Sequence, residues 1–142
     1  MPVFLEIAAG SMMIVLCALV HLSIAAIIVR YLKNSRPLAE TASLRAFFLI
    51  TSGLFLMFLA SHTVQIYLWA FCFWLIGALP GHEAPIYFAL VTYSTVGYGD
   101  LTLARDIRIF GAMASVSGIL MFGMTTAFLV GFFARLLNTR AS

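Results

Sequence analysis

Long apolar runs separated by short polar segments make up most of this chain of 142 residues. Three of these runs, at residues 1–32, 46–79 and 107–137, consist mainly of aliphatic and aromatic side chains. A helix needs about 20 residues to cross a hydrocarbon layer about 30 Å thick, so each run is long enough. The pattern therefore predicts an all-α membrane protein with three transmembrane helices.

A fourth apolar segment, residues 85–94, differs from the others because it is only about ten residues long. It follows the turn residues Pro80 and Gly81, and it is too short to cross a membrane but suits a re-entrant half-helix. Pro85 stands near the expected helix start, and Glu83 is favourable beside the positive end of the helix dipole. We therefore predict a short re-entrant helix and a following loop within residues 82–100.

The sequence TVGYGD, residues 95–100, directly follows this short helix. Irregular backbone lies at membrane depth only where protein buries it or where it lines an aqueous path, because lipid cannot pair its N–H and C=O groups. An extended run here can aim successive carbonyl oxygens toward one axis, and the glycines at 97 and 99 allow the φ values that this needs. One such row cannot surround an ion, whereas several copies related by rotation can.

Composition and charge place the chain in the membrane and orient it. With 63% hydrophobic residues, 9% charged residues and a mean hydropathy of +1.09, it is too apolar for a soluble domain of this size. Six cations occupy or flank the linker 33–45 and the tail 138–142, against only Arg105 and Arg108 on the other side. Positive loops stay in the cytoplasm, which predicts a cytoplasmic linker and C-terminus and an outside N-terminus. The linker is also compatible with a short interfacial helix.

Enzymatic and nucleic-acid functions are not expected from these residues. No pairing of a nucleophile with a base is evident, and the glycines at 97 and 99 lack the Lys and Ser/Thr of a phosphate-binding loop. Cys17 and Cys72 do not have the spacing of a metal site. We expect no cofactor and no nucleic acid partner, because sidedness explains the basic charge.

The residues STVGYGD, 94–100, resemble the selectivity filter of the tetrameric potassium channels and match their TVGYG signature in full. The resemblance covers about residues 46–137 and is to the pore module of small bacterial channels, here with one additional helix in front. It implies a fourfold-symmetric homotetramer embedded in the lipid bilayer of the bacterial inner membrane, with K⁺ as the permeant ion. It also implies the filter residues that bind this ion or shape the mouth, namely Thr95, Val96, Gly97, Tyr98 and Gly99.

The resemblance also implies residues that support the filter. Tyr87 is expected to hydrogen-bond Asp100, which stands at the pore entrance. Phe88 replaces the tryptophan common in the family and offers no N–H to the Tyr98 hydroxyl. We therefore expect Thr92 to be the partner of that hydroxyl.

The third run contains GILMFGMTTAFLVG, which resembles the inner, pore-lining helix of the family. Gly118 matches the position of a hinge glycine, but close helix packing explains it equally well. Packing is the interpretation we favour for Gly111, Gly123 and Gly131. The resemblance places three further residues along the cavity and its narrowing, Ile119, Phe122 and Thr126.

His21 and His62 lie within the first and second apolar runs, where ionisable groups are rare. One interpretation is proton sensing, because histidine titrates near neutral pH. The other, which we favour, is hydrogen bonding between the first and second transmembrane helices.

Taken with the resemblance, the sequence predicts a passive, K⁺-selective ion channel. Two alternatives stay open. One keeps the pore but lacks selectivity, as a general cation channel, and the other is a non-conducting accessory subunit of a different channel.

Overall fold

The computed structural model describes residues 2–34 and 43–141, which form four α-helices. These are α1 (Val3–Asn34), α3 (Leu44–Leu75), α4 (Glu83–Tyr93) and α5 (Arg108–Ala141). No strand occurs in this part of the chain, so the prediction of an all-helical fold is confirmed. The interfacial helix considered for the linker falls mostly on residues 35–42, which lie outside the described residues.

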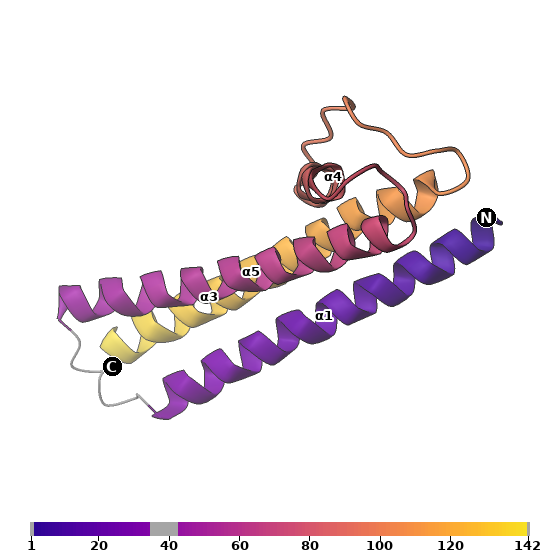
Figure 1. Ribbon diagram of the computed structural model, residues 1–142. Coiled ribbons are helices and arrows are strands. Elements are labelled where there is room, and N and C mark those ends of the chain that lie inside the picture. The colour runs from indigo at the N-terminus through magenta and orange to yellow at the C-terminus, as the bar shows by residue number, and fades with distance from the viewer. Residues whose placement is uncertain (1, 35–42, 142) are drawn as a thin grey trace.

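Three of the helices are long and apolar enough to cross a membrane, over Val3–Leu32, Leu44–Leu75 and Arg108–Ala134. They run side by side in Figure 1, with α1 packed against both α3 and α5. The short helix α4 is seen nearly end-on in the same view, so its axis crosses the long helices steeply. It packs on α3 and α5 at the end of the bundle where α1 begins. This is the architecture of a multi-pass membrane protein.

The second long helix ends earlier than residue 79, where the apolar run ends. Its C-terminus is closed by Gly77, whose φ of +64° suits glycine, the residue that most easily adopts a left-handed conformation. The Gly77 amide donates to the Trp74 carbonyl at 3.0 Å, and the Ala78 amide donates to the Phe73 carbonyl at 2.9 Å. This pair of bonds satisfies carbonyls that the helix end leaves open, and it turns the chain toward α4.

The third long helix is longer than the apolar run that predicted it. Helix α5 begins at Arg108 and continues to Ala141, so residues 138–141 extend the helix and do not form a separate tail. The α3 helix begins at Leu44, two residues before the apolar run, because the Ser43 hydroxyl accepts a hydrogen bond from the Ala46 amide at 3.4 Å.

The apolar interior has two clusters, one at each end of the helix bundle. The larger lies beside α4 and is centred on the fully buried aromatic side chains of Trp69, Phe73 and Tyr93. The smaller is formed by Ile28, Leu54 and Phe58, with partly buried apolar side chains around them. Large apolar side chains elsewhere on the long helices are exposed on the single chain, as expected for surfaces that face lipid or another copy.

Helix α1 is fastened to the start of α5 by a buried carboxylate. Glu6 is only 1% exposed, and its Oε2 accepts hydrogen bonds from the Ile109 amide at 3.0 Å and the Phe110 amide at 3.2 Å. The first amides of a helix have no partner within the helix, and a negative group there is also favoured by the helix dipole. Four residues later, a methyl group at Gly10 would lie 2.5 Å from Met113 Cγ, so α1 and α5 are in close contact.

Candidate ion-conduction site

The TVGYG segment begins directly at the C-terminal end of α4. Ser94 ends this helix, with its amide and hydroxyl both donating to the Leu90 carbonyl, at 3.1 and 2.7 Å. The Thr95 amide then donates to the Thr92 carbonyl at 3.0 Å, and the Gly97 amide donates to the Val91 carbonyl at 3.2 Å. The first half of the segment is therefore held to the last turn of the helix through backbone groups alone.

The backbone of this segment alternates in the sign of φ. It is positive at Thr95 (65°), Gly97 (57°) and Gly99 (76°), and among non-glycine residues of the described chain only Thr95 has a positive φ. In an ordinary strand successive carbonyls point to opposite sides, whereas left-handed residues at alternate positions turn neighbouring peptide groups toward the same side. The two glycines were expected to supply this conformation. Thr95 was not, and its backbone carries the strain of a non-glycine residue in this region.

The side chains of the segment are exposed on the single chain. Val96 is 53% exposed and Tyr98 is 72% exposed, and the surrounding residues 95–100 are exposed as well. Within the described chain no hydrogen bond joins Thr92 to the Tyr98 hydroxyl, so that contact stays a prediction. The Thr92 carbonyl instead accepts a bond from the Ser115 hydroxyl at 2.9 Å, which ties α4 to α5.

Tyr87 and Asp100 form the hydrogen bond that was predicted for them. The Tyr87 hydroxyl on α4 donates to Asp100 Oδ2 at 2.6 Å and so links the residue that follows TVGYG back to the short helix. This bond lowers the pKa of Asp100 below its ordinary value, and the bond to Asp100 raises the pKa of Tyr87. The pair therefore keeps a carboxylate at the exposed end of the segment.

The glycines of α5 fall into two groups. A methyl group at Gly118 would overlap the backbone carbonyl oxygen of Tyr93, and one at Gly111 would overlap the Leu103 side chain. Both positions are therefore close contacts within the chain, which supports packing for Gly111 and gives Gly118 a packing role. No heavy atom lies within 4 Å of a methyl group at Gly123 or Gly131, so this chain provides no packing partner for them.

The residues expected to line a cavity lie along one stretch of α5, beyond the contact with Tyr93. Ile119 is 60% exposed, and the Thr126 hydroxyl is directed back to the Phe122 carbonyl at 2.9 Å. The Phe122 ring packs against the His62 ring, with their centroids 4.6 Å apart. A cavity role for these three residues stays a prediction.

His21 makes hydrogen bonds between the first and second transmembrane helices, which supports the interpretation that we favoured, whereas His62 bonds residues of α4 and α5. His21 Nδ1 is 3.2 Å from the Ser61 hydroxyl of α3. His62 lies between α4 and α5, with Nδ1 3.0 Å from the Tyr93 hydroxyl and Nε2 2.9 Å from the Thr125 hydroxyl. The sequence did not single out Tyr93 or Thr125, because nothing in the local pattern shows which residues of four helices meet at one depth.

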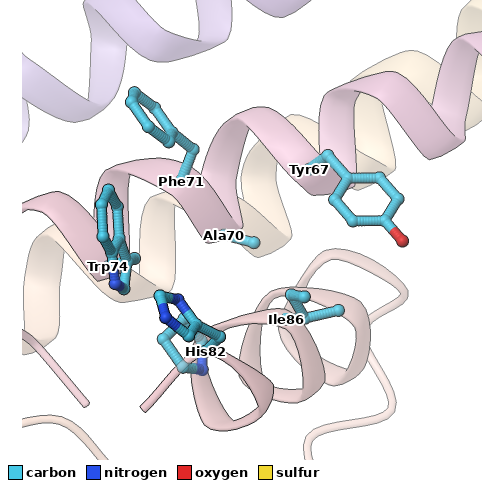
Figure 2. Close-up of a pocket in the computed structure, with 7 residues that line it drawn as sticks. Tyr67, Ala70, Phe71, Trp74, His82 and Ile86 are labelled. Carbon is cyan, nitrogen blue, oxygen red and sulfur yellow. The ribbon is translucent and has the colours of Figure 1, made fainter. Parts of the chain in front are cut away.

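A shallow pocket of about 220 Å³ lies between α3 and α4 (Figure 2). Its lining is apolar apart from one imidazole and one phenol, and consists of Tyr67, Ala70, Phe71, Trp74, His82, Pro85 and Ile86. The His82 ring packs on the Trp74 indole, with centroids 5.5 Å apart, so the pocket wall also holds the loop that precedes α4.

Comparison with known families agrees with this geometry. Residues 71–135, from the last turn of α3 through α4 and the TVGYG segment into α5, match the model of a family described as ion channel. The predicted resemblance to an ion-channel pore module is thereby confirmed for this part of the chain, at the level of an ion channel. No curated protein and no solved structure matches the chain. The match shows similarity to an ion channel over residues 71–135, and the three apolar helices are those of a multi-pass membrane protein.

Proposed function

We propose that four copies of this chain assemble around residues 95–99 and form a K⁺-selective pore. The observation that carries the proposal is the alternating φ of the TVGYG segment, positive at Thr95, Gly97 and Gly99. This backbone is suited to directing neighbouring carbonyl oxygens toward one axis. A row of such oxygens from each copy would replace the water shell of a K⁺ ion.

The exposure of the segment supports assembly around it. A polar backbone at membrane depth needs partners, and on the single chain residues 95–100 are exposed. Neighbouring copies and the permeant ion would supply those partners. The exposed Val96 and Tyr98 side chains would then pack against protein behind the filter.

The electrostatics of the proposed pore favour binding of a cation that is still weak enough for the ion to be released. A bare cation in hydrocarbon costs tens of kcal/mol, roughly, so the ion must keep oxygen ligands along its whole path. Neutral carbonyls lower that cost without binding the ion too tightly for conduction. The C-terminal end of α4 at Tyr93 carries the negative end of a helix dipole, and Asp100 adds a carboxylate at the other end of the filter.

The charge distribution supports an outward-facing filter. Arg30 and Arg45 lie at the end of the bundle away from α4, next to the linker, in keeping with a cytoplasmic location of that end. The filter loop and the N-terminus then lie outside. This orientation, together with the resemblance to bacterial channels, favours the bacterial inner membrane.

Reconstitution of the purified chain into liposomes tests the proposal. We expect K⁺ flux without a partner protein and a reversal potential that follows the K⁺ gradient in mixed K⁺ and Na⁺. Nearly equal permeability to the two ions would instead indicate a general cation channel. An assembled tetramer without flux would indicate an accessory subunit, and an assembly that is not fourfold would reject the pore itself.

A further inference from the structure

Six polar side chains, contributed by all four helices, meet in the interior directly behind the end of α4. Each of them contacts the next, and the last contacts the first, so that they close a cycle in the order Ser61, His21, Thr125, His62, Tyr93 and Gln65. We call this set the polar ring. Ser61, Gln65, His21 and Tyr93 are at most 1% exposed, and His62 is 8% exposed.

The direction of the hydrogen bonds can be worked out, starting at Tyr93. Its hydroxyl donates to Gln65 Oε1 at 2.8 Å, and Gln65 Nε2 donates to the Ser61 hydroxyl oxygen at 3.1 Å. The single proton of the Tyr93 hydroxyl is thereby used, so toward His62 Nδ1, 3.0 Å away, this oxygen must act as the acceptor. His62 must therefore carry its proton on Nδ1.

The same assignment of protons to donors and acceptors continues around the other half of the polar ring. A neutral His62 with its proton on Nδ1 has an acceptor at Nε2, which takes the proton of the Thr125 hydroxyl at 2.9 Å. The Thr125 oxygen then accepts from His21 Nε2 at 3.3 Å. A neutral His21 with its proton on Nε2 has an acceptor at Nδ1, and the Ser61 hydroxyl lies 3.2 Å from it. Every member donates one bond and accepts one bond around the cycle.

This arrangement needs two neutral histidines with opposite tautomers. If either ring gained a proton, both of its nitrogens would become donors, and one neighbouring hydroxyl would face a donor with its own proton. Among the contacts described for the six side chains, none is with a carboxylate or a cation. A buried polar network that is fully satisfied in this way is rigid, because each bond that breaks leaves an unpaired group in a low dielectric.

The polar ring acts on the residue that leads into the filter. Tyr93 is the last residue of α4 and stands two positions before Thr95, and its side chain is fully buried. Its hydroxyl is a member of the ring, and its backbone carbonyl lies against Gly118 of α5. Tyr93 is thus held at its hydroxyl by α3 and at its backbone carbonyl by α5, and α1 reaches it only through the other members of the ring.

We propose that the polar ring positions the filter, so that its six side chains are positioning residues for ion selectivity. This inference rests on the proposed K⁺ channel function. Through the ring, the positions of the long helices determine the position of Tyr93. The backbone hydrogen bonds from the Thr95 and Gly97 amides to the end of α4 then determine the position of the first filter residues.

The hydrogen-bond directions can be tested without any measurement of conduction. The full chain, labelled with ¹⁵N histidine and reconstituted in lipid, is measured by solid-state NMR at neutral pH. A variant with His82→Gln removes the signal of the third histidine. We expect two neutral imidazoles, His62 protonated on Nδ1 and His21 protonated on Nε2. The same tautomer at both histidines, or a doubly protonated ring at either, would overturn the closed cycle.

The effect on selectivity is tested by reversal potentials of variants in mixed K⁺ and Na⁺. Thr125→Val removes the hydroxyl and keeps the shape. We expect the K⁺/Na⁺ permeability ratio to fall roughly 2- to 10-fold, the size of effect that the loss of one part-buried hydrogen bond produces. Thr125→Ser restores a hydroxyl and should restore the ratio. The matched control is Thr63→Val, one position from His62, because the exposed Thr63 hydroxyl only donates to the Leu59 carbonyl of its own helix.

The outcomes separate this inference from the function on which it rests. If the wild-type protein is K⁺-selective and both Thr125→Val and Tyr93→Phe keep its permeability ratio, the positioning role is rejected. If Thr125→Val does not fold, Tyr93→Phe provides the same comparison. If the wild-type protein conducts without selectivity, the proposed function and the positioning role both fail, whereas the NMR result still decides whether the ring exists.

Discussion

The TVGYG segment, which we propose as the filter, and the polar ring are neighbours in this molecule, yet the polar groups of the two regions are satisfied in opposite ways. Residues 95–100 are exposed, with positive φ at alternate positions and few bonds to the rest of the chain. The polar ring is buried except for the half-buried Thr125, and its six side chains pair with one another. The same chain therefore treats its polar groups in two ways: the polar ring satisfies them internally, whereas residues 95–100 leave them open to a partner outside the chain.

A substitution within the TVGYG segment should have the largest effect on K⁺ current. Gly97→Ala places a side chain at φ +57°, which costs an L-residue about 1–2 kcal/mol in each copy. We expect K⁺ current through the reconstituted protein to fall roughly tenfold or more, from that strain repeated in every copy. Gly131→Ala is the control, since it lies within α5 with no heavy atom within 4 Å of the added methyl group. Wild-type current from the Gly97 variant would reject the filter assignment.

Breaking the contact between the two regions should have the next largest effect. Gly118→Ala puts a methyl group on the Tyr93 carbonyl, and overpacking of this kind destabilises a protein by about 1–3 kcal/mol. We expect a lower thermal midpoint in detergent together with a lower K⁺/Na⁺ permeability ratio. Gly123→Ala, five residues along the same helix and without a neighbour within 4 Å, should be neutral or slightly stabilising. Equal effects of the two substitutions would contradict a packing role for Gly118.

Removing the Glu6 carboxylate should destabilise the fold without touching either polar region. Glu6→Ala leaves the Ile109 and Phe110 amides without their acceptor, at a cost of about 1–3 kcal/mol. The thermal midpoint of the purified protein measures this loss. Glu83→Ala is the matched control, because Glu83 is also in the first turn of a helix but is exposed and should contribute only about 0.5 kcal/mol through the dipole.

The smallest expected effect is at Tyr87 and Asp100. Tyr87→Phe removes one exposed hydrogen bond, so we expect less than about a twofold change in K⁺ current. The bond lowers the pKa of Asp100 below its ordinary value of 3.8, so the carboxylate stays charged at neutral and mildly acid pH. The stabilisation from this pair is therefore present above pH 3.8 and is lost as the pH falls through the lowered pKa of Asp100. If the difference in K⁺ current between the wild type and Tyr87→Phe disappeared already near pH 6, this account would be contradicted.

The helical fold was largely predictable because its signals are local, whereas the role of the TVGYG segment as a filter stays a prediction. Long apolar runs predicted three spanning helices, and the short run before TVGYG predicted α4. The end of α3 was placed too late, since Gly77 closes the helix inside an apolar run and its role depends on bonds to Phe73 and Trp74. Local sequence does contain this signal, a glycine just past a helix end, although it was not used.

The polar ring and the Glu6 contact could not be read from the sequence. Both depend on the axial position at which α1 packs against α3 and α5, and no local sequence pattern determines that position. His21 and His62 were noticed as unusual residues in apolar runs, but their partners Thr125 and Tyr93 come from other helices. The positive φ of Thr95 was also missed, because only glycine signals such a conformation by residue type.

The Glu6 contact has a consequence for how the additional helix should be regarded. The Glu6 carboxylate accepts hydrogen bonds from two of the first amides of α5. If the chain were shortened by removing α1, the Ile109 and Phe110 N–H groups would lose this acceptor. The leading helix therefore contributes to the stability of the helices that follow it, and grafting the remainder onto another protein would require a new acid at the same place.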